Sequence, residues 1–302
     1  MGTRENGFLL GLGAYVIWGF FPLYWPLLEP SGPVEVLAHR IVWSLAAVGA
    51  MLLVARRWGA LRGVLRSPRT LGYVAVGAVV IGANWVLFIW GVNNGHVVEV
   101  SLGYFINPLV TILLGVLVMG ERLRPLQWAA LAVALVAVVQ LTLDYGALPW
   151  LALALAASFG TYGLMKKKAA IGAVEGLALE TALLVPLAGG YLVFLHAGAG
   201  GTFGAHGWAH ALLLAGTGLV TVVPLLLFGG AATRVPMATL GLLQYVTPSL
   251  QFVLGLVVFH EQMTTARWVG FALVWLALLL ISAESLAHHR RRVAALREPA
   301  LV

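Results

Sequence analysis

Three charged side chains lie inside long apolar runs of this sequence, and they are the first candidates for chemistry. They are Arg40, Glu99 and Glu180. An ionisable group surrounded by hydrocarbon is costly unless it is paired or hydrated, so each is a functional candidate by default. Arg40 could bind a carboxylate or phosphate of a substrate through its planar guanidinium. Alternatively, its side chain reaches the membrane interface or pairs with Glu35.

The two carboxyl groups suggest proton chemistry. A carboxyl group in a hydrated membrane cavity can load and release a proton, so Glu180 and Glu99 are the candidates for proton coupling. The alternative for Glu180 is a hydrogen bond to a neighbouring helix. The alternative for Glu99 is to cap the first turn of its own helix, where a negative charge suits the helix dipole.

Amide and aromatic side chains gather around two prolines, Pro108 and Pro248. A proline inside a membrane helix frees a backbone carbonyl and bends the helix, so nearby polar groups need partners or a water-filled cavity. Amides can also join helices in lipid without binding anything, and deep tryptophans can be core residues. We expect the substrate site to be formed by Arg40, Asn84, Trp85, Tyr104, Asn107, Gln244, Tyr245, Trp18 and Trp43.

Motifs of cofactor, nucleotide and metal chemistry are missing from the sequence. The absence of Cys removes thiolate metal sites and Cys nucleophiles. The segment His260-Glu-Gln-Met-Thr264 begins like a zinc-protease helix but has Thr where the second His must be. Neither a Walker A nor a G-x-S-x-G motif occurs. We therefore expect no cofactor, no metal ion and no enzyme activity.

Composition indicates the elements that must position these residues. The chain has 302 residues, of which 61% are hydrophobic and 10% charged, with a mean hydropathy of +0.95. Soluble domains are about 45–50% apolar and about 25% charged, so this composition excludes a soluble enzyme or a disordered protein. Spanning segments of this length must be helices, because only helices satisfy their own backbone hydrogen bonds in lipid. Ten runs are predicted spans: 7–28, 34–55, 70–90, 96–119, 126–143, 149–165, 174–195, 208–230, 236–259 and 267–285.

The distribution of positive charge predicts the orientation. With the N-terminus in the cytoplasm, 16 of the 18 Lys and Arg residues fall on the cytoplasmic side. The positive-inside rule accounts for this sorting, so both termini are predicted to be cytoplasmic. The net charge of +7 then reflects topology, and no nucleic-acid partner is expected. The Lys166–Lys168 run is expected to enforce topology and contact anionic lipid.

An internal repeat organises the chain. At an offset of 140 residues, four uncommon residues recur: Pro108/Pro248, Gly115/Gly255, Glu121/Glu261 and Trp128/Trp268. The predicted domains are therefore a five-span repeat at 1–146, a second at 147–287 and a basic cytoplasmic tail at 288–302. An odd number of spans inverts the second repeat in the membrane. Inverted repeats are common in secondary transporters, whose substrate sites lie between the halves at mid-membrane.

Local motifs in these spans resemble a known family. They include Asn84-Trp85, Phe88-Ile-Trp90, Asn93-Asn-Gly-His96, Glu99-Val-Ser-Leu-Gly-Tyr-Phe-Ile-Asn-Pro-Leu109, Gly120-Glu-Arg122, His39-Arg40, Glu180-Thr181 and Leu240-Gly-Leu-Leu-Gln-Tyr245. Together they resemble the EamA-type drug/metabolite transporters, and more closely their RarD subgroup. The resemblance implies an all-α membrane protein with ten transmembrane helices in two inverted five-helix repeats. It also implies export or exchange of small metabolites.

These observations predict a secondary transporter of small amphipathic or polar metabolites or drugs in the inner membrane, working by alternating access, with proton coupling as an option. Its partners would be a small-molecule substrate and the lipid bilayer. The alternative is an intramembrane enzyme or lipid-handling protein. That alternative would need a paired catalytic set at one depth, which the sequence does not display.

Overall fold

Helices form all the regular structure in the described part of the chain. The computed structural model describes residues 3–56, 58–93, 97–145 and 150–258, together with short stretches between 265 and 280. In chain order the elements are α1 (Thr3–Gly19), η1 (Phe21–Leu23), η2 (Trp25–Leu28), α2 (Pro33–Val54), α3 (Trp58–Leu65), α4 (Pro68–Asn93), α5 (Val97–Met119), α6 (Pro125–Tyr145), α7 (Trp150–Ala169), α8 (Ala173–Phe194), η3 (Leu195–Ala199), α9 (Gly207–Ala232), α10 (Met237–Leu243) and α11 (Val246–Val257).

Each of the first nine predicted spans coincides with one or more of these helices. Among the described residues, five helical segments are long and apolar enough to cross a membrane: Glu5–Leu23, Pro33–Val54, Pro68–Phe88, Ala173–Gly198 and Gly207–Ala232. Gly103–Met119 and Pro125–Gln140 are apolar but shorter. The tenth predicted span, 267–285, lies mostly outside the described residues. The all-helical class is therefore as predicted, and the number of ten spans stays a prediction.

The first predicted span is not one continuous helix. α1 ends at Gly19, and the 3-10 turns η1 and η2 follow, each with a proline at one of its first two positions. Proline has no N–H with which to continue the hydrogen bonds of an α-helix. Pro22 and Pro26 therefore convert the end of this span into turns. Trp25, at the start of η2, then lines a cavity between the helices instead of continuing α1.

The ninth predicted span is also divided. α10 ends at Leu243 and α11 begins at Val246, with Gln244 and Tyr245 between them. The short α3 in the Arg-rich connection after α2 is a further difference from the predicted spans.

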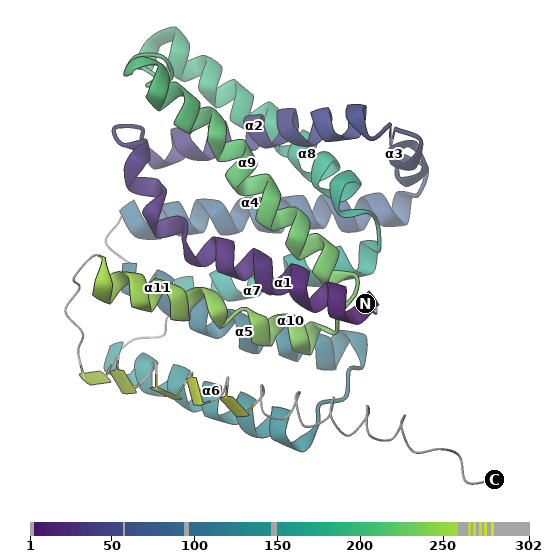
Figure 1. Ribbon diagram of the computed structural model, residues 1–302, viewed down its shortest axis with the longest axis vertical. Coiled ribbons are helices and arrows are strands. Elements are labelled where there is room, and N and C mark those ends of the chain that lie inside the picture. The colour runs from purple at the N-terminus through teal and green to yellow at the C-terminus, as the bar shows by residue number, and fades with distance from the viewer. Residues whose placement is uncertain are drawn as a thin grey trace.

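Helices from the two halves of the chain are interleaved (Figure 1). α1 packs against α9 and α11, α2 against α8 and α9, α4 against α7 and α8, and α5 against α7 and α10. At the α2–α9 contact, a Cβ on Gly218 would lie 2.5 Å from the carbonyl carbon of Trp43. Only a residue without a side chain permits this approach.

A buried aromatic cluster fills the centre of the bundle. Tyr15 of α1, Tyr162 of α7 and Phe228 of α9 are at most 2% exposed. The rings of Tyr162 and Phe228 are stacked, with their centroids 5.8 Å apart. This cluster joins helices from both halves of the chain.

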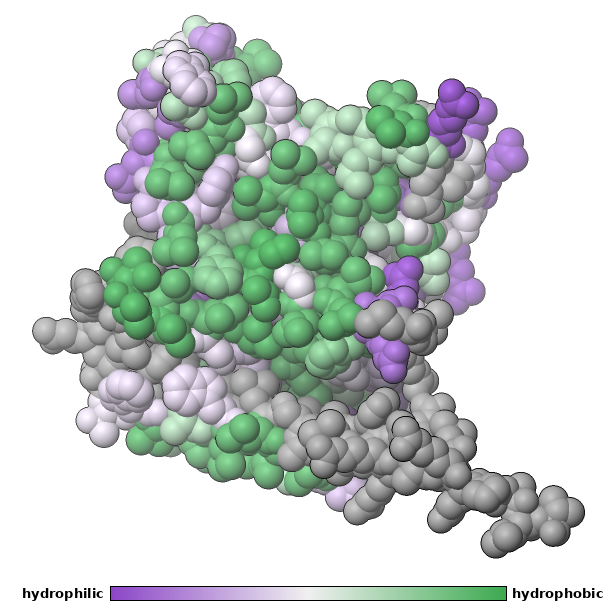
Figure 2. Space-filling model, in the orientation of Figure 1, coloured by the Kyte–Doolittle hydropathy of each residue, from purple (hydrophilic) through white to green (hydrophobic). Residues whose placement is uncertain are grey.

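The outer surface is apolar between the helix ends (Figure 2). Hydrophobic side chains cover most of the visible face, and hydrophilic ones gather near α3, near the N-terminus and at the opposite corner of the view. Leu117, Leu143 and Leu187 are each more than 70% exposed. Such a surface suits contact with lipid chains, because a contiguous apolar patch of this kind is rare on soluble monomers.

Candidate functional site

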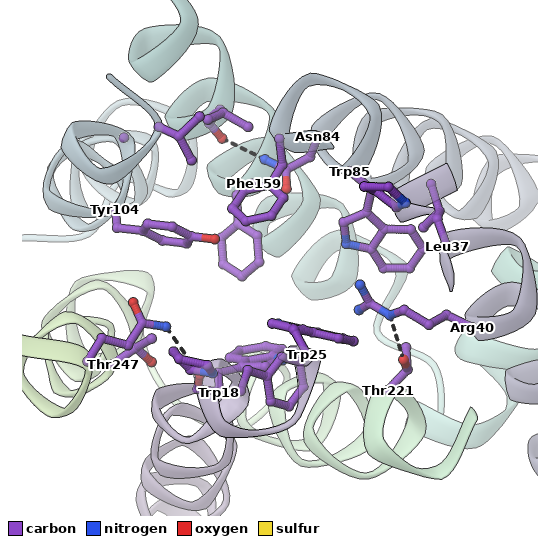
Figure 3. A pocket seen from close by; sticks show the side chains of 18 of the residues that line it. Trp18, Trp25, Leu37, Arg40, Asn84, Trp85, Tyr104, Phe159, Thr221 and Thr247 are labelled. Atoms are coloured by element: carbon purple, nitrogen blue, oxygen red, sulfur yellow. Dashed lines mark hydrogen bonds between the residues drawn. The ribbon is translucent and has the colours of Figure 1, made fainter. Parts of the chain in front are cut away.

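A cavity of about 520 Å³ lies between helices from the two halves of the chain (Figure 3). Its lining comes from α1, η1, η2, α2, α4 and α5 of the first half of the chain and from α7, α9 and α11 of the second half. The lining residues lie in the half of the bundle where α1 and α4 end and where α2, α5 and α7 begin. The volume falls within the range of about 300–1,000 Å³ that is typical of small-molecule sites.

Arg40 reaches from α2 into this cavity, and three neighbours hold its guanidinium (Figure 3). Its Nε donates a hydrogen bond to Oγ1 of Thr221 on α9 at 3.0 Å. Its Cζ lies 4.9 Å from the ring centroid of Trp25 and 5.2 Å from that of Trp85. The terminal nitrogens still have four N–H groups to donate.

Arg40 does not form the alternative pair with Glu35. The Oε1 atom of Glu35 instead accepts a hydrogen bond from the backbone N–H of Thr202 at 2.6 Å. In the part of the chain that the structure describes, no carboxylate forms an ion pair with Arg40. The guanidinium is therefore positioned by a hydroxyl and two indole rings, without a countercharge from these residues.

Aromatic rings form much of the remaining wall. Trp18 and Trp85, both predicted site residues, line the cavity, and Trp18 packs edge-on against Phe159 with ring centroids 5.9 Å apart. Tyr104, also predicted, packs edge-on against Phe88 with centroids 6.2 Å apart.

Trp43 lies outside the cavity lining. Its ring lies 6.0 Å from that of Phe203, and its backbone forms the close contact with α9 at Gly218. We therefore leave Trp43 out of the candidate site.

The predicted amides occupy three different environments. Nδ2 of Asn84 donates to the backbone oxygen of Leu155 and to Oγ of Ser158, both at 3.0 Å. Nε2 of Gln244 donates to Oγ1 of Thr111 at 2.9 Å, which links the α10–α11 break to α5. Oδ1 of Asn107 is buried and has no hydrogen-bond partner in the described part of the chain. All three amides line the cavity.

Tyr245 does not line the cavity. Its side chain is 1% exposed and packs with Phe105 and Ala137 in a separate hydrophobic cluster. The break between α10 and α11 turns two consecutive residues in different directions, so Gln244 faces the cavity and Tyr245 faces α5 and α6.

The two carboxyl groups predicted for proton coupling have different outcomes. Glu180 is buried away from the cavity lining, where its Oε2 lies 2.8 Å from Nζ of Lys166 and 3.1 Å from the hydroxyl of Tyr162. The expectation that Lys166 contacts lipid is therefore wrong, because its side chain is 6% exposed and paired inside the bundle. The side chain of Glu99 lies outside the described residues.

A second polar cluster joins the two halves of the chain at the end opposite the cavity. The carboxylate of Glu121, in the α5–α6 connection, accepts hydrogen bonds from the backbone N–H groups of Met237 at 2.7 Å and Ala238 at 3.0 Å. It also lies 3.2 Å from Nζ of Lys167. Glu121 therefore caps the first turn of α10, where its charge suits the helix dipole.

Among the lining residues that sequence reasoning missed are Trp25, Phe159 and Thr221. The signal for Trp25 was the pair of prolines beside it, which ends α1 and turns the chain inward. For Phe159 and Thr221 no local signal exists, because each lies in an apolar run and acquires its role from the helix packed against it.

Comparison with known proteins shows what the chain resembles. The sequence model of the EamA-like transporter family matches residues 5–143. The chain is 58% identical to "Protein RarD" of Streptomyces exfoliatus, over 98% of this chain and 94% of the relative. It is 42% identical to "Protein RarD" of Escherichia coli, over 96% of this chain and 97% of the relative. It is 33% identical to "Chloramphenicol-sensitive protein RarD" of Pseudomonas aeruginosa, over 94% of this chain and 96% of the relative.

The fold is also similar to that of a solved protein. A crystal structure superposes with a TM-score of 0.70 at 21% sequence identity, and the match covers 93% of this chain and 97% of that chain.

Proposed function

The chain belongs to the EamA-like transporter family and is similar over nearly its whole length to proteins named RarD, and from this premise we propose a secondary transporter. It exports or exchanges small amphipathic or polar metabolites or drugs across the inner membrane by alternating access. The observation that carries the proposal is the cavity enclosed by helices of both halves. Such sites between two repeats are characteristic of secondary transporters.

The polar cluster opposite the cavity supports alternating access. Glu121 of the first half contacts Lys167 and the start of α10 in the second half. These contacts join the two halves at one end, while the cavity lies between helices of both halves toward the other end. A substrate leaves through the closed end only when the contacts of Glu121 break.

Positive charge supports an orientation for the two ends. Lys166, Lys167 and Arg234 lie at the same end as Glu121, as does Arg62 of α3. The positive-inside rule makes this end cytoplasmic, so the cavity faces outward and both termini are cytoplasmic.

The contacts between helices support the inverted repeat. If α1, α2, α4 and α5 correspond to α7, α8, α9 and α10–α11, the main contacts between these helices of the two halves have counterparts. The α4–α7 contact corresponds to α1–α9, α2–α9 to α4–α8, and α5–α7 to α1–α11. The α2–α8 and α5–α10 contacts correspond to themselves.

Transport is tested by substrate exchange in sealed proteoliposomes. Accelerated, saturable counterflow of a small metabolite supports the proposal. Product formation in detergent without counterflow in vesicles would instead indicate an enzyme. The chain has no native Cys, so single cysteines can be introduced directly. Arg122→Cys at the closed end and Leu27→Cys at the cavity end should react with an impermeant thiol reagent from opposite sides of the membrane.

Proton coupling is a separate part of the proposal. Glu180 would carry a proton only when its ion pair with Lys166 opens, which would link protonation to movement of α7 against α8. Gln at positions 180 and 99, singly and together, should reduce uptake driven by a pH gradient. Unchanged pH-driven uptake by all three variants would exclude these carboxyl groups as proton carriers.

A further inference from the structure

We propose that the substrate of this cavity is an organic anion that carries a flat apolar ring, and that Arg40 binds its anionic group. This inference rests on the proposed transport function and adds the substrate class. It follows from the position of the Arg40 guanidinium between the Trp25 and Trp85 rings, with its terminal nitrogens not bound to any described carboxylate.

Charge selects an anion. Arg40 is the sole Lys, Arg or His side chain among the described residues that line the cavity. Glu29, the acidic residue of that lining, is exposed and forms no ion pair with Arg40. The indole faces attract the guanidinium through their quadrupoles but supply no countercharge. A cation in a low-dielectric cavity therefore stabilises an incoming anion.

Geometry prepares Arg40 for this role. The hydrogen bond from Nε to Thr221 fixes rotation of the guanidinium, and the two rings fix its plane (Figure 3). The terminal N–H groups stay available to the two oxygens of a carboxylate, which is the arrangement that gives the strongest charge-assisted hydrogen bonds.

The walls select a flat apolar ring. Trp18, Trp25, Trp85, Tyr104 and Phe159 line the cavity. Aromatic pairs in offset-stacked or edge-to-face geometry are favourable beyond the apolar area that they bury. Aromatic walls alone would also suit an organic cation, but the Arg40 guanidinium in the lining of this cavity repels one.

Binding of four small probes to the detergent-solubilised full-length protein tests the substrate class. The probes are 3-phenylpropionate, its neutral amide, the aliphatic anion hexanoate and the cation 3-phenylpropylamine. Quenching of tryptophan fluorescence reports binding, because Trp18, Trp25 and Trp85 line the cavity. We expect 3-phenylpropionate to bind about 10- to 100-fold more tightly than the amide or the amine, as for one charge-assisted contact. Hexanoate should bind more weakly than 3-phenylpropionate.

Variants assign the preference to Arg40. Arg40→Gln should lose the discrimination between the anion and its amide. Arg40→Lys should keep part of it, because an ammonium is a point charge without a planar fork. The control is Arg69→Gln, which removes an exposed arginine that is not part of the cavity lining. It should bind all four probes as the native protein does.

The outcomes separate the substrate class from transport. Equal or tighter binding of the amide or amine, no saturable binding of 3-phenylpropionate, or discrimination that survives in Arg40→Gln would each overturn the substrate class. Counterflow of the same probes in proteoliposomes tests transport independently. Counterflow of the amine or amide alone would support a transporter and overturn the anion assignment. Selective anion binding without counterflow of any probe would support the anion site and contradict the transport proposal.

Discussion

The buried ion pair of Lys166 and Glu180 is the contact whose removal should have the largest effect on folding. Nζ and Oε2 lie 2.8 Å apart, and the side chains are 6% and 4% exposed. Removing one member of such a pair leaves a buried charge without compensation, at a cost of about 3–5 kcal/mol. Lys166→Met should lower the free energy of unfolding by an amount near the upper end of this range, because Glu180 keeps only the Tyr162 hydroxyl as a described partner. Glu180→Gln should lower it by an amount near the lower end, because the new amide oxygen still accepts a hydrogen bond from Lys166.

The double variant distinguishes the loss of the ion pair from a general destabilising effect of each substitution. Lys166→Met with Glu180→Gln removes both charges at similar volume, a change that is often neutral. It should therefore be more stable than either single variant. The measurement is unfolding in detergent followed by tryptophan fluorescence, with an expected fall in Tm of at least about 6 °C for each single variant.

Lys168, two residues after Lys166, supplies a matched control. Its side chain is exposed, so Lys168→Met should change the free energy of unfolding by no more than about 0.5 kcal/mol. Our reasoning is refuted if the single variants match the control, or if the double variant is as unstable as the two losses added together.

Further variants, two of them controls, test packing, capping and the cavity. Gly218→Ala should lower the free energy of unfolding by about 1–3 kcal/mol, because the new Cβ overlaps the backbone of α2. Gly49→Ala, where the new Cβ meets no atom within 4 Å beyond its own stretch of helix, should raise it by about 0.5–1 kcal/mol, and an equal loss at both sites would contradict this account. Glu121→Ala should cost about 1–2 kcal/mol in the same unfolding measurement, as for a lost helix cap, whereas a neutral result would show that α10 does not depend on it. Asn84→Ala should raise the KM of substrate exchange, while Ser158→Ala, which breaks the same hydrogen bond outside the cavity lining, should leave KM unchanged, and a matching rise in both would assign Asn84 to helix packing.

Most of the predicted site residues line the cavity, so isolated residues were enough to find part of its lining. Arg40, Asn84, Trp85, Tyr104, Asn107, Gln244 and Trp18 were expected at a site and line one cavity. They were recognisable because polar and amphipathic side chains are rare and costly in apolar spans. The same argument cannot tell which side of a helix faces a cavity, so it also selected Trp43 and Tyr245, which face protein.

Partners of charged groups could not be predicted, because they come from distant segments. Lys166 pairs with a residue 14 positions away, and Glu121 caps a helix 116 positions away. The position of a charge in a run indicates that it needs compensation. It does not indicate which helix supplies that compensation.

The helical class, the approximate ends of the described spans and the scarcity of charged residues within them all follow from the order of residues along the chain. They depend on local physics, since lipid requires each spanning segment to satisfy its own backbone and permits few charges. The division of the chain at Pro22 and Pro26 is equally local, because a missing N–H acts at its own position. The cavity, the setting of Arg40 between two indoles and the pairing of Glu180 arise only when the interleaved halves pack. Each depends on side chains that are far apart in the chain. The distance between the helices that carry them is set by contacts such as that of Gly218 with α2, and residues next to them in the sequence do not determine it.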